Sequence, residues 1–144
     1  MSALIETLRE EHGAIARLLA LVRAAGANTA EGRRLLEQLR EEVALHLARE
    51  ERHLFRPLLA VAQPTRLKST LAILAGEASD LQGEAEAFFA RIRAGAGELE
   101  VARGFGRLYA ALGERMRREE TSLFPVFERE DGRAGEAHPS GEIG

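Results

Sequence analysis

The sequence contains no cysteine, so it offers no disulfide bond, no thiol nucleophile and no thiolate ligand for a metal. Any metal ion would have to be bound through nitrogen and oxygen atoms. Aromatic residues are few, at 5% of the chain, and tryptophan is absent. Because β-branched residues are also sparse while leucine and alanine dominate, the composition favours an all-α protein.

Long apolar runs and blocks of one charge are also missing. No stretch approaches the ~18 apolar residues of a membrane span. The 20 basic and 23 acidic residues are interspersed and give a net charge of −3, which leaves no basic patch for nucleic acid. The first residues lead directly into a charged amphipathic pattern, without the features of a signal peptide. We therefore expect a cytoplasmic protein with neither a nucleic-acid nor a membrane partner.

Recognisable catalytic arrangements are missing as well. The sequence has no set of nucleophile, base and acid and no glycine-rich phosphate loop, and the GxG at Gly104-Phe105-Gly106 lies within a helical pattern. Hydrolase, kinase and dehydrogenase functions therefore have no support. We expect a binding protein rather than an enzyme, with peroxide decomposition as the remaining enzymatic alternative.

Four amphipathic segments carry apolar residues at alternating steps of three and four, the spacing that lines one face of an α-helix. Ser2 is suited to cap the first segment, and Asn28 or Thr29 the second. Joined by short loops, the segments predict a single up-down-up-down four-helix bundle over residues 1–130. Residues 131–144, rich in glycine and charge, are expected to form a flexible tail.

Proline residues predict irregularities in two of these helices. Pro57 lies within the second segment and Pro125 near the end of the fourth. A proline inside a helix removes a hydrogen bond and clashes with the preceding turn. We therefore expect a kink near residues 53 to 57 and a helix end before Gln63.

One face of the second segment changes from apolar to polar. Leu39 and Val43 are followed, at the same helical spacing, by His46, Glu50 and His53. Three potential metal ligands thus project from the face that should pack inside the bundle. Because burying an ionisable group without a partner is costly, this polar stripe predicts partners on neighbouring helices.

The first and fourth segments interrupt their apolar faces in the same way. His12 occupies an inward position of the first segment, and Arg115 and Glu119 occupy successive inward positions of the fourth. In an up-down bundle, metal sites are built from such inward side chains on facing helices. We expect these three residues to meet His46 and Glu50 in one polar layer.

These residues resemble the hemerythrin-like family, also called the HHE cation-binding domain, over roughly residues 1 to 130. The family's usual site is a di-iron centre in a four-helix bundle, with histidines from all four helices and two bridging carboxylates. The resemblance rests on three motifs, which are Glu11-His12, His46-x-x-x-Glu50 and the segment from Glu119 to Pro125.

Carried over by position, the resemblance implies four metal ligands. Ala78 and Arg115 stand where the histidines of the third and fourth helices are expected, so half of the di-iron site is missing. Two imidazoles with carboxylates still suit a single non-haem iron, with zinc or manganese as competitors. We therefore expect one iron ion rather than two. The implied ligands are His12, His46, Glu50 and Glu119.

Three further residues are candidates at the same site. His53 follows Glu50 at a spacing used in di-iron carboxylate bundles, although a bond to backbone or water explains it equally. Tyr109 lies beside the inward face, where it would donate a supporting hydrogen bond or simply pack. Arg115 could pair with Glu119 and Glu50 in place of a cation. Other charged neighbours are assigned to the solvated flank, namely Glu51, Glu77 and Glu120.

Two functions are consistent with this sequence. The first is a non-haem iron protein that senses or handles iron, dioxygen, nitric oxide or peroxide. The second is a metal-free bundle whose polar core is held by Arg115 salt bridges and which serves as an interaction or ligand-binding module. The expected partners are a small diatomic or peroxide ligand and, as an open alternative, a second copy in a homodimer.

Overall fold

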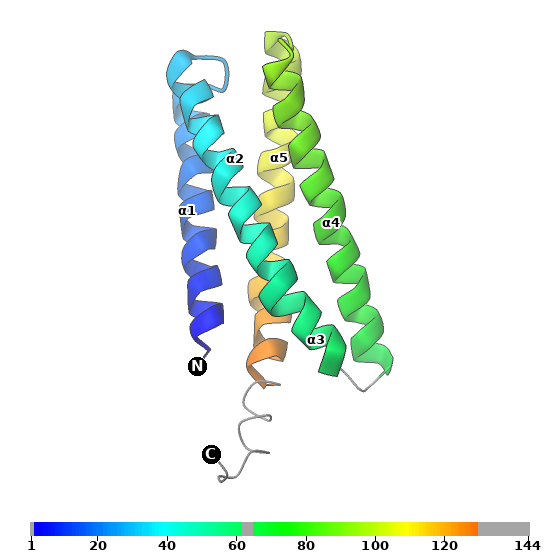
Figure 1. The fold of residues 1–144 in the computed structure, drawn as a ribbon. Helices are drawn as coiled ribbons and strands as arrows, with labels where there is room; N and C mark the ends of the chain where they lie inside the picture. The colour runs from blue at the N-terminus through cyan, green and yellow to red at the C-terminus, as the bar shows by residue number, and fades with distance from the viewer. Residues whose placement is uncertain (1, 62–64, 130–144) are drawn as a thin grey trace.

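A computed structural model describes residues 2–61 and 65–129, which form four helical rods that run alternately up and down (Figure 1). The predicted all-α four-helix arrangement is confirmed. The predicted tail and its boundary at residue 130 lie outside the described residues. The first rod is α1 (Ala3–Ala25). The second rod consists of α2 (Ala30–Glu50), η1 (Glu51–Phe55) and α3 (Arg56–Val61). The third is α4 (Thr65–Arg93), and the fourth contains α5 (Glu98–Arg118) and η2 (Glu119–Leu123).

Local caps set the ends of the first two rods. The Ser2 hydroxyl accepts a hydrogen bond from the Ile5 N–H at 3.3 Å, as its N-cap position predicts. Gly26 ends α1 at a φ of 91°, a left-handed conformation that favours glycine. Thr29, rather than Asn28, caps α2, because its hydroxyl accepts from the Gly32 N–H at 2.9 Å.

Pro57 and Pro125 each follow a π-helical turn, where the sequence predicted only an irregularity. In η1 the Arg56 N–H donates to the Glu51 carbonyl, and in η2 the Phe124 N–H donates to the Glu119 carbonyl. In a regular α-helix Pro57 and Pro125 would each clash with the carbonyl four residues earlier, and both of those carbonyls lie inside a π segment. The wider turn therefore accommodates each proline, and the helix continues beyond it.

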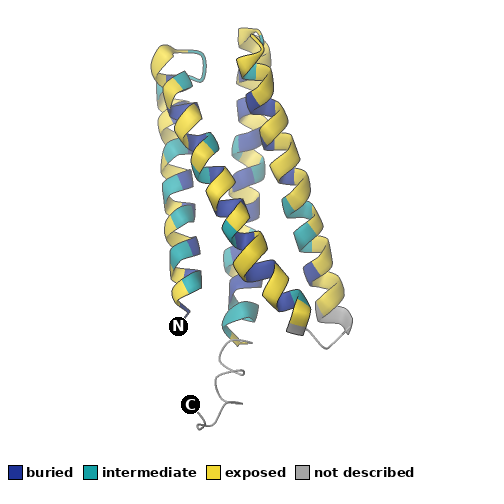
Figure 2. Ribbon diagram, in the orientation of Figure 1, coloured by how far each residue is buried: buried dark blue, intermediate teal, exposed yellow. Residues whose placement is uncertain are grey.

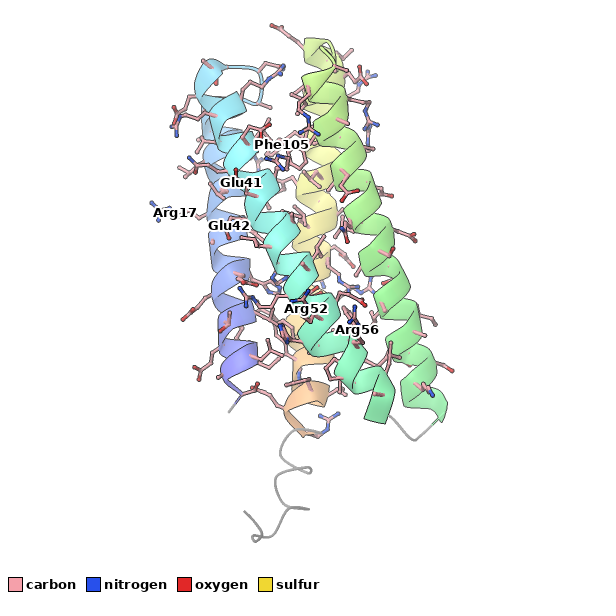
Figure 3. The ribbon with its side chains drawn as sticks, viewed as in Figure 1. Arg17, Glu41, Glu42, Arg52, Arg56 and Phe105 are labelled. Carbon is pink, nitrogen blue, oxygen red and sulfur yellow. The ribbon has the colours of Figure 1, made fainter. Side chains whose placement is uncertain are left out.

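The apolar core is divided into two clusters by a polar layer. The inward faces of the helices are buried while the outward faces are exposed (Figure 2). Side chains follow the same division: Phe105 lies between the helices, whereas Arg17 points away from the bundle (Figure 3). One cluster includes Ile15, Leu47, Leu81 and Leu112, and the other includes Leu8, Leu54, Leu71 and Leu123. The layer between them holds His12, His46, Glu50, Arg115 and Glu119, all of which are buried.

No helix among the described residues is both long and apolar enough to cross a membrane.

Gly104 allows α4 and α5 to approach each other closely. A Cβ atom at this position would lie 2.6 Å from Cδ1 and Cε1 of Phe88, whose buried ring has little room to move. By contrast, a Cβ atom at Gly113, in the same helix, would meet no atom within 4 Å.

We expect Gly104→Ala and Gly113→Ala to change stability in opposite directions. The first overpacks the core and should lower the free energy of unfolding by about 1–3 kcal/mol. The second should raise it by about 1 kcal/mol, because alanine is the better helix former. Urea denaturation followed by circular dichroism measures both. Equal effects of the two substitutions would contradict this account of the α4–α5 contact.

Candidate metal centre

Four side chains from three rods converge in the polar layer. Each of them offers one ligand atom, and these atoms all lie within 4.8 Å of one another. Their residues are almost completely buried, with exposed fractions between 0% and 4%. The residues are His12 of α1, His46 and Glu50 of α2, and Glu119 at the start of η2. The layer predicted from the sequence therefore exists.

Helical register and the π turns bring these groups to one height. His46 and Glu50 are four residues apart and share a face of α2. Glu50 is the last residue of α2 before the π turn η1, and Glu119 is the first residue of η2. Each of the two inner carboxylates thus lies at the N-terminal end of a π turn. Such turns inside α-helices are frequent at functional sites.

The inner atoms of this cluster face one another at short range. Glu119 Oε1 lies 2.9 Å from His12 Nε2 and 3.8 Å from His46 Nε2, and Glu50 Oε2 lies 2.9 Å from His46 Nε2. The last contact is close but lacks hydrogen-bond geometry. His46 Nε2 and both Glu50 oxygens consequently have no hydrogen-bond partner among the described residues. One buried nitrogen and two buried oxygens without partners fit a bound cation, which would satisfy all three.

Each imidazole is held from its other side by a carboxylate that the sequence analysis did not assign to the site. His12 Nδ1 lies 2.7 Å from Glu120 Oε2, and His46 Nδ1 lies 2.8 Å from Glu11 Oε1. Glu11 also accepts a hydrogen bond from Arg49 Nε at 2.6 Å. Glu120, assigned to the solvated flank, is 37% exposed yet pairs with the ring. The sequence feature that could have indicated these contacts is position, because Glu11 directly precedes His12 and Glu120 directly follows Glu119.

Burial and mutual contact shift the pKa values of three of these groups. Burial lowers the pKa of His46, but the carboxylates of Glu119, Glu50 and Glu11 outweigh it and raise the pKa to about 10. Burial raises the pKa of Glu50 to about 8, with His46 opposing the rise. Burial also disfavours the Glu119 carboxylate, but the neighbouring His12, His46, Glu50 and Arg115 side chains outweigh it and lower its pKa. His46 and Glu50 thus keep their protons at neutral pH in the absence of a metal ion, and a metal ion would displace these protons.

The structure brings one of the three additional candidates into this layer. Arg115 Nε donates a hydrogen bond to Glu119 Oε2 at 2.8 Å, and its side chain is only 6% exposed. His53 is exposed on η1, where it lines a surface pocket with Arg49 and Arg52. The Tyr109 hydroxyl pairs instead with Arg23, with 3.4 Å between its oxygen and Nη1 of the arginine.

Comparison with known proteins agrees with this geometry. A family model described as the hemerythrin HHE cation binding domain matches residues 3–127. No curated protein and no solved structure matches the chain.

We expect Glu50→Gln to stabilise the chelator-treated protein by about 1–2 kcal/mol at pH 7, because burial raises the pKa of Glu50 to about 8 and folding must protonate this carboxyl group, a cost that glutamine avoids. Thermal denaturation in the presence of a chelator measures the change. Glu51→Gln is the matched control, since Glu51 is the exposed neighbour and should leave stability unchanged. A Glu50→Gln protein less stable than the wild type would contradict this account of the buried Glu50 carboxyl group.

Proposed function

Because the chain belongs to the hemerythrin HHE cation-binding domain family, we propose that it binds one non-haem iron ion in the buried layer. His12 and His46 would supply nitrogen ligands through Nε2, and Glu50 and Glu119 would supply carboxylate oxygens. The observation that carries this proposal is the convergence of four buried ligand atoms, two of which, His46 Nε2 and the Glu50 oxygen, have no hydrogen-bond partner among the described residues. Neutral imidazoles with carboxylates suit ferrous iron, while zinc and manganese compete for the same set.

The bound ion would serve to sense or handle iron itself or a small ligand such as dioxygen, nitric oxide or peroxide. Iron supplies a Lewis acid with accessible redox states. Two histidines and two carboxylates leave coordination positions open on an ion that accepts six ligands. The Phe124 ring stacks on His12 at a centroid distance of 5.4 Å, which keeps one side of the cluster apolar and dry.

A metal-free bundle is the second candidate function, and the contacts of Arg115 favour it. The guanidinium pairs with Glu119, and the two imidazoles pair with carboxylates on both sides, so the layer also forms a charge network without an ion. Such a network sets the register of a bundle more than its stability. The protein would then act as an interaction or ligand-binding module, a role that requires no metal uptake.

Metal content after anaerobic loading with ferrous iron separates the two functions. We expect about one iron ion per chain, by plasma mass spectrometry, because the four ligand atoms enclose a space that suits one ion. The combined substitution His12→Ala and His46→Ala removes both nitrogen ligands and should abolish uptake. A wild-type protein that binds no metal would refute the iron proposal and favour the second candidate function, the metal-free bundle.

His53→Ala is the matched control for this measurement. His53 is an exposed imidazole on the same rod as His46 and should not change the iron content. Loss of iron in this variant would place a ligand outside the buried layer.

We expect Glu11→Gln to weaken iron binding by about 10–100-fold, because Glu11 holds Nδ1 of His46 and thereby keeps Nε2 directed at the ion. Competition with a chromophoric chelator measures the dissociation constant. Glu10→Gln changes the exposed neighbour of Glu11 by the same atoms and should have no effect. Equal affinities in the two variants would contradict a role for Glu11 in orienting the ring.

A further inference from the structure

The two oxygens of Glu119 face different groups. Oε1 points toward the imidazoles, at 2.9 Å from His12 Nε2 and 3.8 Å from His46 Nε2. Oε2 accepts the hydrogen bond from Arg115 Nε at 2.8 Å. The carboxylate is 1% exposed. It therefore connects the candidate cation position directly to a permanent positive charge.

Arg115 is held firmly in this place. Its guanidinium lies 5.5 Å from the centre of the Phe55 ring, and its Nη1 lies 3.7 Å from Glu77 Oε1. Nη1 and Nη2 are buried and have no hydrogen-bond partner among the described residues. A guanidinium does not lose its proton in proteins. Its charge consequently acts on the cluster at close range, where little water screens it.

The balance of charge in the layer limits how many cations it can hold. Glu50 and Glu119 are the buried carboxylates among the described residues. With neutral imidazoles, one divalent cation and Arg115 together exceed these two carboxylates by a single positive charge. A second divalent cation would add two further positive charges to the buried layer, whose remaining carboxylates, Glu11 and Glu120, lie on the outer side of the imidazoles, and this is unfavourable.

We infer that Arg115 is a built-in counter-cation that confines this cluster to one divalent cation. It occupies Oε2 of Glu119, which leaves Oε1, the oxygen that faces the imidazoles, to bind the ion. Its charge stands where a second ion would have to approach the same carboxylate. This inference rests on the proposed function, since it describes how the same site limits and holds its ion.

The same arrangement must also weaken the binding of the single ion. Arg115 competes with the ion for Glu119 and repels it through space. A neutral side chain at this position should therefore tighten binding, whereas a ligand-orienting role for Arg115 would make the same change loosen it. The direction of the change distinguishes the two roles.

The experiment compares anaerobic binding of ferrous iron, by number and affinity, in the wild type and three variants. We expect one ion in the wild type and about tenfold or more tighter binding in Arg115→Gln, which removes the buried charge. Arg115→Lys keeps the charge and should bind one ion with near wild-type affinity. Arg118→Gln is the matched control, because Arg118 is 38% exposed and its charge is screened by solvent.

Each result bears on one claim. Two ions in the wild type, or Arg115→Gln binding no tighter than the wild type, would overturn the role of Arg115 while leaving the cation site itself in place. A wild type that binds no ion refutes the proposed function instead. If the glutamine variant fails to fold, as judged by circular dichroism, the ion count of the wild type and the affinity of Arg115→Lys decide the question.

Discussion

The structure depends on the cost of burying ionisable groups between two apolar clusters. His12, His46, Glu50, Arg115 and Glu119 interrupt the core at the same height on three rods, and each is almost inaccessible to water. Such a layer persists only if its charges compensate one another or a bound ion compensates them. The mutual contacts compensate part of the charge, but His46 Nε2 and the Glu50 oxygens are left without hydrogen bonds. This remainder is the physical basis for assigning a cation site to the layer.

The surrounding scaffold fixes the geometry of that layer. The π turn η1 follows Glu50 and η2 begins at Glu119; both turns accommodate the nearby prolines, and each helix continues beyond the level of the site. Outer carboxylates hold the far side of each imidazole, and Arg49 in turn holds Glu11. Rigid support of this kind keeps ligands in place before an ion arrives. Burying these polar groups lowers the stability of the fold, but the surrounding contacts hold them in a preorganised site.

Much of this arrangement could be predicted from the sequence, because helical periodicity determines which side chains face inward. The steps of three and four placed His12, His46, Glu50, Arg115 and Glu119 correctly in the core, and the short loops implied that they meet. The roles of Glu11 and Glu120 were not predicted, since both lie beside the inward face, and adjacency to an inner residue does not distinguish them from solvated charges until the crossing of neighbouring helices is known. The π turns were not predicted either, because a proline in a helical segment indicates an irregularity without specifying its form. The contacts of the two Glu119 oxygens, one with the imidazoles and the other with the Arg115 guanidinium, likewise depend on side-chain rotamers, which the spacing of residues in the sequence does not determine.

The most direct test of the central claim, that this layer is a cation site, is a crystal structure of the iron-loaded protein with diffraction data collected at the iron absorption edge. The account predicts one anomalous peak per chain, bounded by Nε2 of His12 and His46 and by oxygens of Glu50 and Glu119, with Arg115 still bonded to Glu119. An absence of any peak in this layer, or a peak bound elsewhere on the chain, would contradict it.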